Sequence, residues 1–458
     1  MKVIICGAGQ VGFNIARYLA SENADITVID QSPELIQKIV DSFDVTGLVG
    51  FASHPDVLER AGARDADMVI AVTYADEVNM VACQICHSLF DVPTKIARVR
   101  HQSYLHPMWA DLFSRDNMPI DVVISPEVEV ARAINHRLGI PGAFDVIPLA
   151  DGRISLIGVH CGEDTPILET PLRQLTALFP DLHIVIVAVL RDGEGLVPSA
   201  DDVLLAGDDV YFVADTAHIG RAMASFGHEE TEARRVVIVG GGNIGLNLAQ
   251  SVEASASGVN LKVIEIDKKR AEFVAQTLDR TVVIHGSALD TEILEEANIA
   301  ATETVVAVSN DDEVNILASL LAKRYGCQRS VTLVNKTSYG PLIGTLGIDT
   351  VVSPRSITVS TILQHVRRGR IRSVHTLWEG FGELIEAEVM ETSSLVGVPL
   401  RESELPDGVL IGAIVRRREV IIPRADTVVR SGDLVILFVM TAAVKKVEKL
   451  FAVKLEFF

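Results

Sequence analysis

Two glycine-rich segments carry the residue types and the Gly-x-Gly-x-x-Gly spacing that bind phosphate. They are Gly7-Ala8-Gly9-Gln10-Val11-Gly12 and Gly240-Gly241-Gly242-Asn243-Ile244-Gly245. In such a loop the first glycine permits a tight turn, the second lets the backbone approach a pyrophosphate, and the third lets a helix pack closely on a strand. The following helix directs unpaired N–H groups and its positive dipole end at the phosphates. The spacing predicts a nucleotide site in each half of the chain.

An acidic residue follows each loop at the end of the next apolar strand. Asp30 ends the strand 27–30, and Glu265 ends the strand 262–265. A carboxylate at this position accepts hydrogen bonds from both ribose hydroxyls and repels a 2′-phosphate, which favours NAD or another adenosine nucleotide over NADP. The alternative is that each acid is merely exposed beside a helix cap.

Further candidates lie where ligands bind in open parallel sheets, at the carboxyl ends of strands. Thr73-Tyr74 and Ser309-Asn310 are expected to end the fourth strand of each half, where they could contact ribose or phosphate. Ordinary N-capping of the following helix explains them equally well. Arg98, expected to end the fifth strand, could meet a phosphate, but Leu333 replaces it in the second half, so the two sites are expected to be unequal.

The duplication extends beyond the glycine loops to the whole chain. The segments 71–79 and 307–315 match, each containing Asp-Glu-Val-Asn, and Ser125-Pro126 pairs with Ser353-Pro354. A unit of roughly 225 residues therefore occurs twice. The polar stretch 227–232 is the expected linker between the copies.

The predicted pattern of secondary structure changes once along each unit. Short apolar strands alternate with helical patterns in its first part, which predicts a parallel sheet. A Ser-Pro-initiated crossover helix follows (127–138 and 356–367), and then a small module with hairpin signals. The predicted fold is α/β, with two Rossmann-like doubly wound lobes, each followed by a crossover helix and a small α+β lobe. The predicted domains are nucleotide-binding lobes at 1–123 and 232–349, and small lobes at 143–227 and 369–453.

Composition limits the classes of partner. The 458 residues hold 41 Lys and Arg against 61 Asp and Glu, a net charge of −20, which disfavours nucleic acid as a partner. No apolar run approaches the roughly 20 residues that span a bilayer, and the N-terminus enters a strand directly instead of forming a signal peptide. Five cysteines do not make a disulfide framework. We therefore expect a soluble, cytosolic protein.

Two other patterns have a structural and a functional interpretation. Cys83-Gln84-Ile85-Cys86-His87 spells a c-type haem attachment motif, but it falls inside an apolar-periodic helix, so small residues packed against the sheet explain it better. The basic runs 367–372 and 416–418 could bind anionic partners, with a solvated helix end and a hairpin turn as the alternative. Scattered histidines show no metal-ligand spacing, and we expect no metal site.

The paired loops, the acids, the Asp-Glu-Val-Asn segments and the Ser-Pro helices together resemble a known family over essentially the whole chain. The chain resembles the TrkA-type regulatory subunits of bacterial Trk potassium-uptake systems, which are built from two tandem RCK (KTN) units. The resemblance implies a peripheral protein on the inner face of the membrane, assembled as a ring-like homo-oligomer beneath a membrane-embedded potassium channel or transporter subunit. It also implies NAD(H), or in some members ATP or ADP, in the Rossmann lobes.

By match to that family, the first site would use Gly7, Ala8, Gly9, Gln10, Val11, Asp30, Thr73, Tyr74 and Arg98. The second would use Gly240, Gly241, Gly242, Asn243, Ile244, Glu265, Ser309 and Asn310. Neither half holds a matched His, Lys or Tyr that would serve as a catalytic acid or base beside a nucleotide. We therefore expect a ligand-sensing regulator and not an enzyme. An NAD-dependent oxidoreductase of unidentified substrate, and a scaffold with relic glycine loops, are the alternatives.

Overall fold

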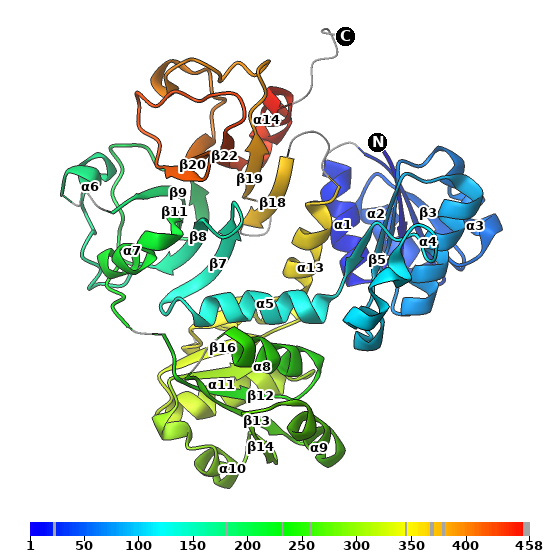
Figure 1. The fold of residues 1–458 in the computed structure, drawn as a ribbon, viewed down its shortest axis with the longest axis horizontal. Coiled ribbons are helices and arrows are strands. Elements are labelled where there is room, and N and C mark those ends of the chain that lie inside the picture. Colours follow the sequence, from blue (N-terminus) through cyan, green and yellow to red (C-terminus); the bar gives the residue numbers. More distant parts are fainter. Residues whose placement is uncertain are drawn as a thin grey trace. The chain divides into compact units, whose positions relative to one another are not determined.

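The computed structural model describes residues 1–21, 24–178, 182–230, 232–255, 258–343, 346–366, 371–377 and 381–451 (Figure 1). The chain forms two compact units. One combines Met1–Ala131 with Ser353–His365, and the other combines Arg132–Val352 with Val366–Phe458. No helix in the described part of the chain has the length and apolar composition needed to cross a bilayer.

The first unit is built on a six-stranded parallel sheet in the order β3-β2-β1-β4-β5-β6. Its strands are β1 (Lys2–Cys6), β2 (Asp25–Asp30), β3 (Thr46–Val49), β4 (Met68–Ala71), β5 (Thr94–Arg98) and β6 (Val122–Ile124). Its helices are α1 (Gln10–Ser21), α2 (Pro33–Ser42), α3 (Pro55–Arg60) and α4 (Asp76–Phe90). The order reverses between β1 and β4, which is where doubly wound sheets bind their ligands.

The core of this lobe explains why its strands read as unbroken apolar runs. Helices cover both faces of a parallel sheet, so residues pointing either way are buried. All four residues of β4 are buried, and so are Val3 to Cys6 in β1. Cys83 and Cys86 of α4 belong to the same apolar cluster, as the structural interpretation of that motif predicts.

The second parallel sheet repeats the first, in the order β14-β13-β12-β15-β16-β17, and lies in the second unit. Its strands are β12 (Arg235–Val239), β13 (Asn260–Glu265), β14 (Val282–His285), β15 (Thr304–Ala307), β16 (Arg329–Leu333) and β17 (Thr350–Val352). Its helices are α8 (Asn243–Ser255), α9 (Lys268–Thr277), α10 (Thr291–Glu296), α11 (Asp312–Arg324) and α12 (Gly340–Ile343). The prediction of two Rossmann-like lobes is confirmed.

Two small antiparallel sheets complete the second unit. Their orders, β10-β9-β11-β8-β7 and β18-β19-β22-β20-β21, are the same topology read from opposite ends. The first has β7 (Ala143–Leu149), β8 (Ile154–His160), β9 (Ile184–Arg191), β10 (Glu194–Leu196), β11 (Asp209–Asp215), α6 (Leu172–Leu178) and α7 (Ile219–Ser225). The second has β18 (Ile371–Leu377), β19 (Gly382–Glu388), β20 (Val409–Arg416), β21 (Glu419–Ile421), β22 (Leu434–Met440) and α14 (Val444–Phe451).

The two small sheets share one core. Phe438 and Leu384 of the second copy lie in the same buried cluster as Val213 and Leu156 of the first. A buried hydrogen bond from the Ala150 amide to the Glu386 carboxylate (3.0 Å) also joins the copies. The duplication therefore allows the small lobes to pair within one chain.

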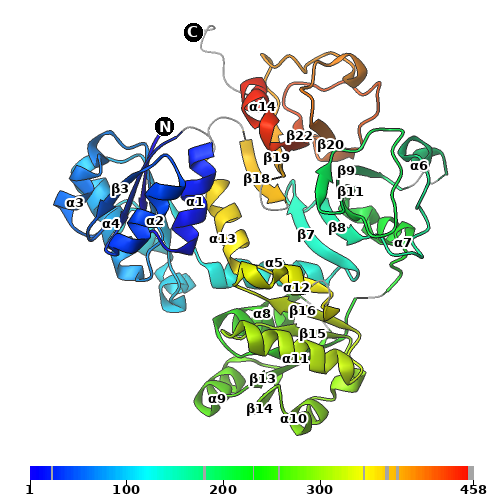
Figure 2. The ribbon, with the colours of Figure 1, turned by 180° about the vertical axis from the view of Figure 1, so that it is seen from behind.

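The crossover helices are α5 (Pro126–Leu138) and α13 (Pro354–Leu363). The part of the second helix expected at Arg367 lies outside the described residues, as do positions 367–370 of the first basic run. Although α13 belongs to the second copy, it lies in the first unit and packs against α1, as both views show (Figures 1 and 2).

Candidate nucleotide-binding sites

The three glycines of the first loop have three different surroundings. Gly7 has a φ of +112°, and a Cβ added there would lie 3.1 Å from the Thr73 backbone. A Cβ added at Gly12 would lie 1.8 Å from the Gly7 carbonyl oxygen, so only glycine lets α1 approach the strand this closely. A Cβ at Gly9 would meet no protein atom within 4 Å. The second glycine therefore keeps open space above the loop.

The second loop reproduces this geometry. Gly240 has a φ of +105°, and a Cβ at Gly245 would lie 1.9 Å from the Gly240 carbonyl oxygen. A Cβ at Gly242 again meets nothing within 4 Å. The tight-turn and close-packing roles expected of the first and third glycines are thus confirmed in both copies. The open space at the middle glycine is the cradle that a diphosphate would fill, so the residues fit such a ligand.

The residue before each helix is a glycine, Gly9 before α1 and Gly242 before α8, so this position supplies no side chain to cap the first N–H groups. The first α-helical hydrogen bond runs from the Phe13 amide to the Gly9 carbonyl (2.8 Å), and from Leu246 to Gly242 in the second copy (2.9 Å). The N–H groups at the start of a helix have no intrahelical acceptor. Those of Gln10, Val11, Asn243 and Ile244 therefore lie at the helix end where an anion binds most favourably.

The two acids hold the loops in shape, a role that the sequence did not suggest. Asp30 accepts hydrogen bonds from the amides of Ala8 (2.7 Å) and Ser32 (2.9 Å). Glu265 does the same with the amides of Gly241 (2.6 Å) and Asp267 (2.8 Å). A carboxylate has about four lone-pair sites, so these bonds leave acceptor capacity for ribose hydroxyls.

The residues expected to end the fourth strand lie beyond it. β4 ends at Ala71 and β15 at Ala307, so Thr73, Tyr74, Ser309 and Asn310 are loop residues. The expected N-capping is also wrong in detail, because α11 is capped by Asp311, and α4 has no side-chain cap. Tyr74 is 84% exposed. Thr73 and Ser309 remain next to Gly7 and Gly240, at the same sheet edge as the loops.

The repeated Asp-Glu-Val-Asn segment connects neighbouring backbone segments at this edge of the sheet by side-chain hydrogen bonds. Asn79, fully buried, accepts a hydrogen bond from the Thr73 amide (2.8 Å) and donates one to the Arg98 carbonyl (2.9 Å). Asn315 makes the equivalent bonds to Ser309 (2.8 Å) and Leu333 (3.0 Å).

The aspartate at the start of each segment makes a second set of hydrogen bonds to the backbone. Asp76 accepts hydrogen bonds from the amides of Arg100 and His101, which follow β5. Asp312 does so from Asn335 and Lys336, which follow β16. These residues therefore fix the positions of the loops that flank the candidate sites.

Arg98 ends β5 as predicted, and buried Leu333 ends β16. Burial, and then the neighbouring Arg100 guanidinium, lower the pKa of Arg98. Its Nε atom is buried without a hydrogen-bond acceptor among the described residues. Arg100 instead donates to Glu127 (3.0 Å) and lies over the Tyr74 ring (5.4 Å). The side chains that end these two strands differ, and unequal ligand binding by the two sites stays a prediction.

Two arginines that the sequence reasoning missed contact the loops. Arg355 of α13 donates a hydrogen bond to the Gln10 side chain at the first loop. Arg270 of α9 donates to the Gly241 carbonyl (2.6 Å) and to the Asn243 side chain (3.3 Å) at the second. Arg270 follows Glu265 closely in sequence, and this proximity could have indicated that Arg270 lies near the second loop. Arg355 had only a weak signal, the change from Ser-Pro-Glu to Ser-Pro-Arg between the copies.

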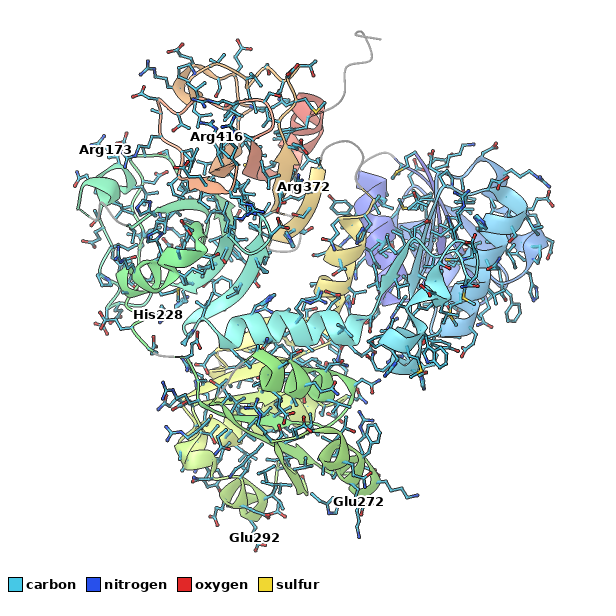
Figure 3. All side chains as sticks on the ribbon, in the orientation of Figure 1. Arg173, His228, Glu272, Glu292, Arg372 and Arg416 are labelled. Atoms are coloured by element: carbon cyan, nitrogen blue, oxygen red, sulfur yellow. The ribbon has the colours of Figure 1, made fainter. Side chains whose placement is uncertain are left out.

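The remaining patterns have structural explanations. Cys83 and Cys86 are buried, and burial raises the pKa of both thiols, that of Cys86 to about 12. In the described residues no group of three or more His, Cys, Asp or Glu side chains is placed to hold a metal. Arg416, labelled in Figure 3, forms a two-pronged ion pair with buried Asp433 (2.9 and 2.7 Å). Arg417 and Arg418 follow it in a turn with positive φ.

Comparison with known proteins gives the same organisation. Residues 3–126 and 236–354 match the TrkA-N domain, and residues 159–227 and 384–452 match the TrkA-C domain. The crystal structure of the GsuK RCK domain superposes with a TM-score of 0.59 over 98% of this chain and 94% of that chain. The GsuK channel bound to NAD has the same TM-score over 98% and 78%. Both are 19% identical, which establishes a shared fold.

Curated relatives match over the full length. The Trk system potassium uptake protein TrkA of Azorhizobium caulinodans is 54% identical over 458 residues, covering 100% of both chains. The protein of the same name from Halomonas elongata is 43% identical over 462 residues, also covering 100% of both. The resemblance inferred from the motifs is confirmed: the chain belongs to the TrkA family, as a tandem of two TrkA-N and two TrkA-C domains.

Proposed function

We propose that this chain is a nucleotide-binding regulatory subunit that gates a membrane-embedded potassium channel or transporter subunit. The observation that carries the proposal is the duplicated cradle: two glycine loops, each with open space above its middle glycine and a carboxylate beside it. The full-length similarity to proteins named for Trk potassium uptake supports the transport role.

NAD(H) is the proposed ligand of both lobes, with ATP or ADP as further adenine nucleotides of the same sites. The site residues are those predicted from the sequence, with Asp30 and Glu265 both shaping the loop and accepting from the ribose. A carboxylate in this position disfavours a 2′-phosphate, so NADP is expected to bind weakly. The GsuK channel bound to NAD, which has the same fold, supports this choice of ligand.

Ligand occupancy is proposed to act by biasing a conformational equilibrium and not by chemistry. A ligand shifts such an equilibrium only if it binds one state more tightly than the other. We place the protein at the inner face of the membrane, in a ring-like homo-oligomer with its potassium-transporting partner. The boundaries 1–123, 143–227, 232–349 and 369–453 stay predictions for the four domains.

The test is calorimetry with NADH on the full chain, comparing the parent with Asp30→Asn and Glu265→Gln. Each variant keeps the size of the side chain but replaces one acceptor oxygen with an NH₂ group, so each is expected to lose binding at its own lobe only. Binding that both variants retain in full at both lobes would refute the site assignment. Turnover of NADH with a metabolite would favour an oxidoreductase instead.

The transport role has a separate test. Affinity purification of the full chain from membranes should recover a potassium-transporting membrane protein. Potassium flux through that partner should then change when NADH or ATP is added with this chain. A flux that is the same with the parent chain and with the Asp30→Asn, Glu265→Gln double variant would contradict the gating role.

A further inference from the structure

The second copy places one of its residues at the first nucleotide loop. Helix α13 begins with Ser353 as its N-cap, whose hydroxyl accepts from the Ser356 amide (3.3 Å), and continues with Pro354. Arg355 therefore lies in the first turn, and its side chain is half-buried. Since α13 packs on α1 within the first unit (Figures 1 and 2), this turn lies beside the start of α1.

The contact of Arg355 lies next to the phosphate cradle. Its Nη2 atom donates to the Oε1 atom of Gln10. Gln10 is exposed, is the first residue of α1, and directly follows Gly9, above which the space is open. A guanidinium is a planar fork of five N–H donors, a geometry that suits phosphate oxygens. A phosphate oxygen is also a stronger acceptor for this cation than the neutral amide of Gln10.

The second loop has an arginine in the same relation, but from a different element. Asn243 occupies the position of Gln10, and Arg270 donates to its side chain (3.3 Å). Ser32 and Asp267 are equivalent caps, accepting from the amides of Leu35 and Arg270. Leu35 thus stands in the first copy where Arg270 stands in the second. The first loop lacks a cation from its own copy at this position and has Arg355 from the other copy.

We propose that Arg355 is a phosphate-binding residue of the first nucleotide site, which is therefore a composite of both copies. The proposal rests on the proposed function, because it requires a nucleotide in that site. The ligand would bridge the glycine loop and α13, holding the second copy's crossover helix against the first lobe. Ligand binding and the packing of α13 on α1 are thermodynamically linked. If the ligand stabilises this packing by a given factor, a change that separates α13 from α1 weakens ligand binding by that factor.

The test uses the full chain carrying Gly242→Val. The valine fills the open space of the second loop, so that nucleotide binding is measured at the first loop. On this background, calorimetry compares adenosine, AMP, ADP and NADH. Arg355→Gln should weaken ADP and NADH about tenfold or more, the range for a hydrogen bond to a charged group, and leave adenosine unchanged. Arg355→Lys, which keeps a point charge without the planar fork, should lose less.

The matched control is Arg64→Gln on the same background, which removes an exposed arginine of the first lobe that pairs with Glu59 and should leave ADP affinity unchanged. Hydrogen exchange supplies a second measurement: ADP should protect the amides of α13 in the parent but not in Arg355→Gln. Circular dichroism checks that each variant is folded.

Three results would overturn the inference. Unchanged ADP affinity in Arg355→Gln would reject it and leave the proposed function standing. An equal loss for adenosine and ADP would show a structural effect on the loop and reject it too. If the parent bound neither ADP nor NADH, the proposed function would fail and the inference with it.

Discussion

Adding one methyl group at Gly9 or at Gly12 should have opposite consequences, although the two glycines are only one helical turn apart. At Gly12 the new Cβ would lie 1.8 Å from the Gly7 carbonyl oxygen and 3.0 Å from its carbon. Both are backbone atoms that cannot rotate away, so α1 must move off the sheet. At Gly9 the Cβ meets nothing within 4 Å, and the φ of Gly9 is outside the left-handed region.

The magnitudes follow from these surroundings. Overpacking costs about 1–3 kcal/mol, and a backbone clash falls at the upper end, so Gly12→Ala should lower the Tm of the first lobe by roughly 10 °C. Gly9→Ala should change stability by less than about 1 kcal/mol, and can even stabilise, because alanine restricts the unfolded chain. Its methyl group instead occupies the space proposed for the diphosphate, so NADH affinity at the first site should fall about tenfold or more.

Thermal unfolding followed by circular dichroism, together with NADH calorimetry below the transition, measures both effects. The second copy offers a matched pair, since Gly242 is open and a Cβ at Gly245 would lie 1.9 Å from the Gly240 oxygen. Gly242→Ala and Gly245→Ala should therefore show the same contrast at the second site. The reasoning is refuted if Gly9→Ala lowers the Tm as much as Gly12→Ala, or if it binds NADH with parental affinity at the first site.

Three further predictions concern buried side chains. Asn79→Leu and Asn315→Leu should each lower the free energy of unfolding by about 3 kcal/mol in denaturant titrations, because each leaves backbone groups of a loop and of a strand end without their partners. An effect below about 1 kcal/mol would contradict this role. Burial opposes ionisation of Asp208, but hydrogen bonds from Arg191 (2.6 Å) and the Leu205 amide outweigh it and hold the pKa of Asp208 below its usual value. This stabilisation is complete above the pKa of Asp208 in the unfolded chain and is lost as pH falls through its pKa in the folded protein. Asp208→Asn should therefore be less stable than the parent at neutral pH, and its stability should fall less steeply in acid. An unchanged profile of stability against pH would contradict this role of Asp208. Because all five cysteines are buried, a thiol reagent at neutral pH should label them only after unfolding, and rapid labelling of Cys83 or Cys86 in the native protein would contradict their packing role.

Much of the fold was predictable because the signals that specify it are local. Glycine spacing specifies a strand–loop–helix turn, and apolar runs interrupted by helical patterns specify a parallel sheet. The duplication then doubled every such signal. Boundaries were less predictable: the strand expected to reach Thr73 ends at Ala71, where the pairing of β4 with β1 and β5 ends. Strand pairing depends on the neighbouring strands, which a local pattern does not reveal.

The sequence by itself determined the two nucleotide lobes, their loops and the acids Asp30 and Glu265. Only the tertiary structure decided what surrounds those loops. It showed that the acids accept hydrogen bonds from loop amides, that Asn79 joins the loop after β4 to the end of β5, and that Arg355 of the second copy contacts the first loop. The physical reason is that hydrophobic periodicity and backbone geometry act over a few residues, whereas these contacts form only when helices and strands distant in the chain pack together.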